Sequence, residues 1–306
     1  MERKNNWKAW LYLAPVLILM SIFTFFPLIN TFVVSFMKDY NSVTGANSGF
    51  TFSNYGVVLG ITPRDPSVGT LDKSFFSWNS PSALTNTLLI TVVTVPISVI
   101  LALVIAIALN HIKVFQKFLE TVFFMPYDTN VIAVGMVFSV IFSGGGVFNK
   151  LFGSSIDWIG KSSTWGSAMF VLCLYIIWTA LPYKILIFLS GLQGIDKQYY
   201  DAAKIDSTPR LKTELPLLSP QILYIIVTSF IGAFKEYNAV VGLFNRSYTT
   251  NGNVNDLYTV VYYIYDKLGS GNGQVQYASA AAVILFVIIM IFTFVQMQVS
   301  KKRVHY

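Results

Sequence analysis

Charged side chains are scarce in this sequence. Asp, Glu, Lys and Arg make up 11% of the 306 residues, whereas hydrophobic residues make up 54%. A soluble globular protein carries about 25% charged residues. So few charges would not keep a chain of this apolar content in water, and the composition therefore indicates an integral membrane protein.

The residue types that carry most enzyme chemistry are almost missing. The single cysteine, Cys173, excludes an intrachain disulfide and a cysteine metal site. The two histidines, His111 and His305, are far apart and have no ligand-like neighbours in the sequence. No nucleophile and base stand out as a pair. The sequence therefore predicts no catalytic residue, no metal site and no enzymatic activity of the chain itself.

A phosphate-binding loop is absent as well. The residues GGGVFNK at 144–150 contain glycines and a lysine, but their spacing differs from G-x-x-x-x-G-K-[ST] and no Ser or Thr follows. The chain is therefore expected to hold no ATP and no other cofactor by itself.

Long apolar runs make up most of the chain. A spanning helix needs about 20 mostly apolar residues. Six segments meet this requirement, and they are too long and too uniformly apolar for barrel strands. The first run is longer than the roughly 7–15 apolar residues of a secretory signal, so we expect it to remain as a helix. We predict an all-α integral membrane protein with a single transmembrane domain over residues 1–306 and spans at about 9–36, 84–109, 121–142, 165–191, 217–240 and 277–299.

The basic residues predict the orientation of these spans. Six spans place both termini on one side of the membrane. Twelve Lys and Arg fall in the termini and connections of that side, and eight are spread over the longer loops of the other side. Because positive charge near short loops marks the cytoplasm, we expect a multi-pass protein of the cell (inner) membrane with both termini cytoplasmic. The net charge of +7 then reflects topology and lipid, and does not predict nucleic-acid binding.

One predicted cytoplasmic segment, residues 194–216, interrupts the apolar pattern with charges and prolines. Asp196 can cap a short helix that begins near Lys197, and Pro209 prevents that helix from continuing. Paired alanines allow the backbone of a partner to approach closely. The residues that share one face of this helix are Tyr199, Ala202, Ala203 and Asp206. From the residues alone, a docking helix–turn–helix and an ordinary solvated loop are both open.

The motifs along the chain resemble those of ABC-importer permeases, in the carbohydrate branch that includes the maltose and glycerol-3-phosphate permeases. YYDAAKIDS at 199–207, followed by LPLLSP at 215–220, resembles the cytoplasmic EAA loop of that family. The resemblance covers nearly the whole chain. The other sequence motifs that resemble the family are FFMP at 123–126, AVGMVF at 133–138, IDWIG at 156–160, LIFLSGLQGIDKQYYDAAKID at 186–206, YASAAAVILFVIIMIFTFVQ at 277–296 and the ending RVHY.

The resemblance implies a fold, a function and a set of partners. The fold is the type I ABC importer permease fold, with six transmembrane helices and cytoplasmic coupling helices. The function is that of a permease subunit in an ATP-driven, binding-protein-dependent importer, forming half of the translocation pathway for a carbohydrate. The implied partners are a second homologous permease, two ATP-binding subunits that hold ATP and Mg²⁺ and hydrolyse the nucleotide, and an extracytoplasmic solute-binding protein. The residues carried over as the ATPase-docking set are Tyr199, Asp201, Ala202, Ala203 and Asp206.

The loop departs from the family pattern in two ways. The glycine that the family has after the second acidic residue is Ser207 here. The stretch from Ser207 to Glu214 is also shorter than the family pattern by about four residues, close to one helical turn. We therefore expect either a shorter second coupling helix or a different start of the fifth span.

Charged residues within the predicted spans are candidates for the solute path. Asp128 and Lys184 lie at similar depth, about 12–14 Å from the cytoplasmic ends of their spans. A lone charge at that depth is costly, so we expect both to face inward and to pair, either in the path or as a purely structural ion pair. By carry-over from the family, the further path candidates are Tyr127, Lys235, Glu236, Tyr237 and Asn238, with Tyr183 as a weaker one. The alternative for the residues after Phe234 is that the span ends there and the charges lie in water.

Two other functions are compatible with a polytopic membrane protein. An ion-coupled secondary transporter would use Asp128 or Glu236 as a proton or cation site. Such transporters often contain inverted repeats, and no internal repeat is evident here. A membrane scaffold without transport would tolerate neutralisation of every intramembrane charge. Neither alternative explains the EAA-like loop.

Overall fold

The computed structural model describes residues 6–64, 67, 69–78, 80–112, 116–160, 162–244, 257–269 and 274–301. Within these ranges the regular structure is helical, apart from one isolated bridge between Met37 and Phe50. The predicted all-α fold class is therefore confirmed. The elements are α1 (Asn6–Met20), η2 (Ser21–Phe25), α2 (Phe26–Ser35), α3 (Ser53–Val58), α4 (Ala83–His111), α5 (Gln116–Phe124), η3 (Met125–Asp128), α6 (Val131–Ile141), α7 (Val147–Phe152), α8 (Trp165–Gln193), α9 (Lys197–Ile205), α10 (Arg210–Leu217), α11 (Ser219–Phe234), α12 (Asn238–Phe244), α13 (Val260–Gly269) and α14 (Val275–Lys301).

Four of these stretches are continuous, apolar and long enough to cross a membrane. One is residues 10–35, where the helix continues through the π-helical turn η2. The others are helices α4, α8 and α14. Two further candidates are bent pairs of helices. The helical stretch of residues 116–128 meets α6 at a bend of 98°. Helix α10 meets α11 at a bend of 57°. The described residues thus contain four candidate spans, or six if each bent pair crosses as one.

The third span was predicted as one helix over 121–142, and the structure breaks it. Pro126 is the second residue of the short 3₁₀ helix η3, and a proline lacks the N–H that a continuing α-helix requires. Asn130 then caps a new helix, since its side-chain oxygen accepts hydrogen bonds from the N–H groups of Ile132 and Ala133. A break of this kind exposes backbone polar groups, and in membrane proteins such groups are tolerated where they line a cavity.

The chain divides into two compact units. The first consists of residues 1–75 and 263–287. Its loop after α2 is fastened by Asn54, whose buried amide donates to the carbonyl oxygens of Ser35 and Met37, both at 2.9 Å. Asp72 pairs with Lys267 at 3.2 Å in the same unit. Burial acts to raise the pKa of the Asp72 carboxyl, but the hydrogen bonds from Ser74 and the charge of Lys267 outweigh it and lower that pKa.

The second unit consists of residues 76–262 and 288–306, and α4 packs against α8 at its centre. One face of α4 carries only small side chains, all buried. Their spacing of three or four residues places them on one stripe, which lets the α8 backbone approach closely. The stripe consists of Thr87, Thr91, Thr94, Ser98, Ala102 and Ala106. Toward the α9 end of this unit, Leu192 of α8, Leu218 between α10 and α11, and Ile225 of α11 complete an apolar core with α4.

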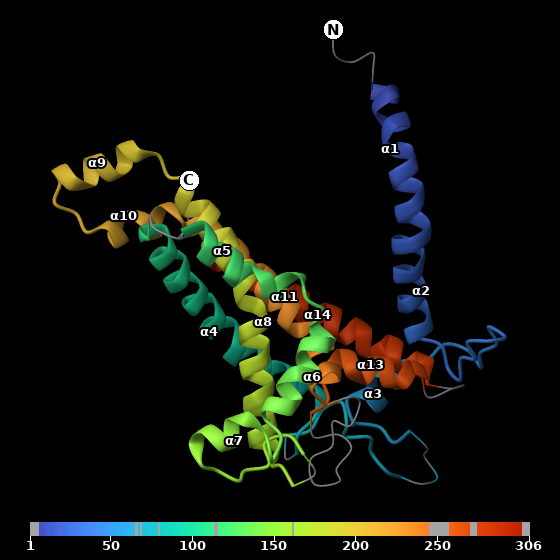
Figure 1. Cartoon of the computed structure of the whole chain (residues 1–306). Coiled ribbons are helices and arrows are strands. Elements are labelled where there is room, and N and C mark those ends of the chain that lie inside the picture. Colours follow the sequence, from blue (N-terminus) through green and yellow to red (C-terminus); the bar gives the residue numbers. More distant parts are fainter. Residues whose placement is uncertain are drawn as a thin grey trace. The chain divides into compact units, whose positions relative to one another are not determined.

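Helices α9 and α10 lie at one end of α8, and α7 lies at its other end (Figure 1). The α9–α10 pair is the short charged segment between α8 and α11. At the α7 end, Asn86 donates to the carbonyl oxygen of Tyr258 at 3.0 Å and accepts from the Trp165 indole at 3.2 Å. These bonds hold the starts of α4 and α8 together, and the region between the two ends contains a cavity. The prediction of a single domain over residues 1–306 stays a prediction.

Candidate functional site

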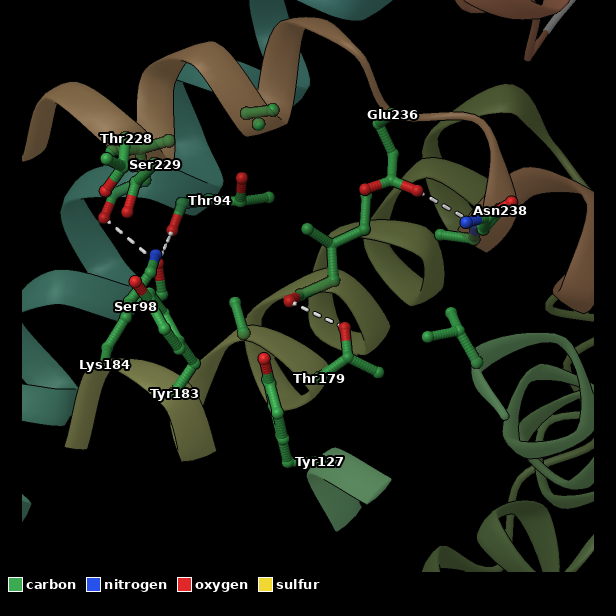
Figure 2. A pocket seen from close by; sticks show the side chains of 17 residues that line it. Thr94, Ser98, Tyr127, Thr179, Tyr183, Lys184, Thr228, Ser229, Glu236 and Asn238 are labelled. Carbon is green, nitrogen blue, oxygen red and sulfur yellow. Dashed lines mark hydrogen bonds between the residues drawn. The ribbon is translucent and has the colours of Figure 1, made fainter. Parts of the chain in front are cut away.

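A cavity of about 430 Å³ lies within the second unit. Its walls come from α4, η3, α6, α8, α11 and the start of α12 (Figure 2). The polar lining residues are Thr94, Ser98, Tyr127, Thr179, Tyr183, Lys184, Thr228, Ser229, Glu236 and Asn238. A cavity of this volume has room for a small solute, and hydroxyl and aromatic groups predominate in the polar part of its wall.

Lys184 is the buried cation of this cavity. Only 6% of its surface is exposed, and its ammonium donates to the hydroxyl of Ser98 on α4 at 2.5 Å. Ser98 in turn donates to the carbonyl oxygen of Thr94 at 2.6 Å. The small-residue stripe of α4 explains this contact, because the two helices are close enough for a lysine of α8 to reach a serine of α4.

Glu236 lies between α11 and α12 and is half-buried. Its carboxylate accepts a hydrogen bond from the backbone N–H of Ala239 in the first turn of α12 at 2.9 Å. Its backbone carbonyl oxygen accepts from the Thr259 hydroxyl at 2.7 Å. The carboxylate therefore already has a backbone hydrogen-bond partner.

Aromatic rings line another part of the wall. The ring of Tyr127 is stacked with that of Tyr183 at 6.0 Å between centroids, and with that of Phe124 at 5.2 Å. The hydroxyls of Tyr183 and Tyr224 lie 3.0 Å apart. Aromatic faces offer a large apolar surface with a polar edge, which suits the faces and hydroxyls of a sugar ring.

The structure brings together four of the predicted path residues: Tyr127, Lys184, Glu236 and Asn238 all line the cavity. The weaker candidate Tyr183 also lies there. Lys235 is exposed and does not contribute to the wall. Tyr237 is absent from the lining too, and its ring packs on Tyr262 at 5.5 Å.

The expected ion pair between Asp128 and Lys184 is wrong. Asp128 is exposed at the end of η3 and lines a separate cleft together with Glu120. Lys184 bonds to Ser98 instead. The sequence estimate placed both residues at one depth in straight helices, and the 98° bend after η3 removes Asp128 from that position.

Sequence analysis missed the hydroxyl side chains of the cavity. They are Thr94 and Ser98 of α4, Thr179 of α8, and Thr228 and Ser229 of α11. The recurrence of Thr and Ser at positions 87, 91, 94 and 98 is a helical period inside an apolar span, and this pattern could have indicated a polar face.

The predicted docking segment forms the expected helix–turn–helix. Helix α9 begins at Lys197, and its cap Asp196 accepts a hydrogen bond from the Gln198 N–H at 3.0 Å. Pro209 stands immediately before α10. Helix α10 extends to Leu217, and α11, the apolar helix of the predicted fifth span, begins at Ser219. Four members of the docking set are exposed, namely Tyr199, Asp201, Ala202 and Asp206, while Ala203 is half-buried. Their role in docking stays a prediction.

A polar cluster joins α9 to α10. Glu214 is fully buried and accepts a hydrogen bond from Arg210 Nε at 2.6 Å and one from the Tyr200 hydroxyl at 3.3 Å. The Arg210 guanidinium also lies over the Tyr200 ring, 4.8 Å from its centroid. Burial acts to lower the pKa of Arg210, but the hydrogen bonds to Glu214 and Tyr200 outweigh it and raise that pKa. The three side chains hold the shortened loop in one conformation.

A family model described as "Binding-protein-dependent transport system inner membrane component" matches residues 95–306. These residues contain every lining residue of the cavity except Thr94, and both helices of the α9–α10 pair, and they make up more than half of the chain.

Individual relatives match over most of their length. The lactose transport system permease protein of Rhizobium radiobacter is 29% identical, over 87% of this chain and 85% of the relative. The sn-glycerol-3-phosphate transport system permease protein of Agrobacterium fabrum is 28% identical, over 99% of this chain and 97% of the relative. The arabinooligosaccharides transport system permease protein of Bacillus subtilis is 28% identical over 84% and 77%.

A solved structure has the same fold. One chain of a bacterial ABC transporter involved in the import of the acidic polysaccharide alginate superimposes with a TM-score of 0.69, 19% identity and coverage of 98% of this chain and 96% of that chain. A second structure, of the alginate transporter in complex with a periplasmic protein bound to alginate pentasaccharide, gives a TM-score of 0.72 at 18% identity. At this identity the likeness shows the fold, which is the type I importer fold predicted from the sequence.

Proposed function

Because this chain belongs to the family of binding-protein-dependent transport system inner membrane components, and is a permease subunit of such an importer, we propose that its cavity forms half of a translocation path for a carbohydrate. The observation that carries the proposal is the cavity itself, with hydroxyl side chains and stacked tyrosines in one wall. The relatives named for lactose and for arabinooligosaccharides transport support a sugar as the solute.

Helices α9 and α10 are proposed to couple this path to ATP hydrolysis in a partner. Ile205 of α9 and Leu211 of α10 are 85% and 51% exposed, next to the exposed Ala202. An exposed apolar surface on a rigid helix pair suits insertion into a cleft of another protein. We assign ATP and Mg²⁺ binding to two separate ATP-binding subunits, since this chain has no phosphate-binding loop.

The remaining partners complete the proposed cycle. A second homologous permease would supply the other half of the path, and an extracytoplasmic solute-binding protein would deliver the sugar. Closure of the ATP-binding subunits would move the α9–α10 pairs together and open the path outward. Hydrolysis would then return the path to its inward-facing state.

The test is binding-protein-stimulated ATP hydrolysis by the complex purified with its partners, before and after Ala202→Arg. A long charged side chain at this exposed position would block close approach of the partner, so we expect co-purification or stimulated hydrolysis to be lost. The matched control is Lys204→Gln, because Lys204 lies on the other side of α9 and its pair with Asp201 is exposed. The control should keep both properties.

The competing function makes an opposite prediction. An ion-coupled transporter would move solute in vesicles that contain this chain without ATP-binding subunits, and Glu236→Gln would abolish that movement. If uptake by the chain alone follows an imposed proton gradient and Ala202→Arg has no effect, the importer function is wrong.

A further inference from the structure

Lys184 is the one charged group of the cavity without a charged or backbone partner among the described residues. The other charged group in the lining is Glu236, which the N–H of Ala239 already holds. Lys184 contacts only the neutral hydroxyl of Ser98, and none of the ion pairs among the described residues includes it. Figure 2 shows the two side chains apart from each other, with Lys184 beside Ser98 and Glu236 beside Asn238.

A counter-charge stabilises an ammonium that is this deeply buried. Lysine has three N–H donors, and Ser98 accepts one of them. Transfer of an unpaired charge out of water is costly, and a buried cation is normally paired. Because the cavity is also where the solute would pass, an anionic group on the solute can supply the missing partner.

Three of the hydroxyls that line the cavity already donate their protons within the protein. Ser98, Thr179 and Thr228 donate their protons to backbone carbonyl oxygens of their own helices, at 2.6, 3.1 and 2.8 Å. They therefore present oxygen lone pairs to the cavity, which accept from sugar hydroxyls but repel an anion. Lys184 is thus the lining group that favours a negative charge.

We propose that the transported carbohydrate is acidic, carrying a carboxylate, phosphate or sulfate group that binds to Lys184 while its sugar hydroxyls donate to Ser98, Thr179 and Thr228. This inference rests on the proposed importer function and deepens it, since it names the chemical class of the solute. Lys184 then acts as a specificity determinant within the membrane path, separate from the selection made by the solute-binding protein.

The experiment uses the complete complex in proteoliposomes with its solute-binding protein. The probes are a trisaccharide of hexuronic acids, glycerol phosphate and a neutral trisaccharide of glucose. Uptake is measured for the wild type, Lys184→Met and Lys184→Arg. Methionine keeps the length and removes the charge, whereas arginine keeps the charge. Lys235→Met is the matched control, since it removes a neighbouring positive charge that lies outside the cavity wall.

We expect an acidic probe to be taken up and Lys184→Met to slow this uptake by about tenfold or more, which corresponds to about 1.4 kcal/mol. Lys184→Arg should restore most of the rate, and Lys235→Met should resemble the wild type. ATP hydrolysis without binding protein should stay within about twofold of the wild type in Lys235→Met, because Lys235 lies outside the cavity wall. The two acidic probes distinguish a carboxylate from a phosphate.

Three outcomes would overturn the inference. In the first, only the neutral trisaccharide is taken up and Lys184→Met leaves its rate unchanged, which leaves the importer function intact. In the second, Lys184→Met and Lys184→Arg both abolish uptake together with basal hydrolysis, which would make Lys184 a purely structural residue. In the third, the complex imports no probe and its hydrolysis ignores the binding protein, in which case the importer function fails as well.

Discussion

Among single residues, the turn between α9 and α10 contains a serine in a backbone conformation that normally selects glycine. Ser207 follows α9 with a φ of +52°. For a residue with a Cβ, the left-handed region costs roughly 1–2 kcal/mol relative to the right-handed one. The resemblance places a glycine at this position in the family, and the structure gives the physical reason.

We therefore predict that Ser207→Gly stabilises the α9–α10 turn by about 1 kcal/mol. Amide hydrogen exchange across residues 197–217 should become slower by about fivefold. The control is Thr208→Gly, the same replacement one residue further on, where φ is not positive and the added flexibility should speed exchange. Faster exchange in Ser207→Gly would contradict this prediction. It would mean that the serine side chain stabilises the turn by more than the left-handed backbone conformation destabilises it.

Burial determines how much an ion pair contributes to stability, as the two ion pairs of the α9–α10 segment illustrate. The pair of Glu214 with Arg210 has one fully buried partner, whereas the pair of Lys204 with Asp201 is exposed on both sides. Exposed pairs contribute about 0–1 kcal/mol, because water and salt screen them. Removal of one partner from a buried pair costs several-fold more, since the other charge is left without compensation.

We predict that Glu214→Gln destabilises the α9–α10 pair by about 1–3 kcal/mol. Limited proteolysis of the purified complex should then cleave within residues 197–217 faster than in the wild type. Lys204→Gln removes a charge from the same segment and should leave the cleavage rate nearly unchanged. Equal rates for the two variants would mean that Glu214 does not hold the helices together.

At the scale of elements, two glycines allow α6 and α12 to cross. A Cβ added at Gly135 of α6 would lie 2.6 Å from the backbone carbon of Gly242 in α12. Side-chain atoms essentially never approach backbone so closely, so the helices would have to separate. The crossing fixes the start of α12, where Ala239 binds Glu236, and thereby one wall of the cavity.

We predict that Gly135→Ala lowers stability by about 2 kcal/mol or more, because the collision is with backbone rather than with a mobile side chain. The midpoint of thermal aggregation in detergent should fall accordingly. Gly166→Ala in α8 is the matched control, since nothing lies within 4 Å of its added Cβ. That variant should be neutral or slightly stabilising, as alanine has the higher helix propensity. A Gly135→Ala protein that melts like the wild type would contradict the close crossing.

At the scale of the whole molecule, the orientation in the membrane is a prediction from the distribution of basic residues. The structure places α7 and the α9–α10 pair at opposite ends of α8 (Figure 1). If α8 crosses the bilayer, these two elements face opposite sides. The single cysteine makes the prediction easy to test, because Cys173 is buried and can be removed.

In a Cys173→Ala background, we predict that Leu151→Cys reacts with a membrane-impermeant maleimide in intact cells. Leu151 lies on α7 and is 76% exposed. Lys204→Cys on α9 should react only after the membrane is permeabilised. Reversed labelling would place both the termini and the coupling segment outside, which no ATP-binding partner in the cytoplasm could reach.

Sequence alone was sufficient to predict the fold class of the protein and the helix–turn–helix of residues 197–217. A membrane excludes most alternatives to helices, so composition and the length of apolar runs were sufficient to predict the fold class. Local capping rules likewise located α9 at Lys197 and the break at Pro209, since these signals depend on neighbours in the chain. Local order of this kind can be predicted without knowledge of the packing.

Tertiary structure decided which polar residues share a cavity. The bend after η3 separates Asp128 from Lys184, and the narrow face of α4 brings Ser98 to Lys184 instead. Neither the separation of Asp128 from Lys184 nor the contact of Ser98 with Lys184 follows from position along the chain. The depth of a residue in a span does not tell which neighbouring helix its side chain faces once the helix is bent or rotated. The hydroxyl groups of α4, α8 and α11 surround one solute-sized volume only because three helices pack closely there.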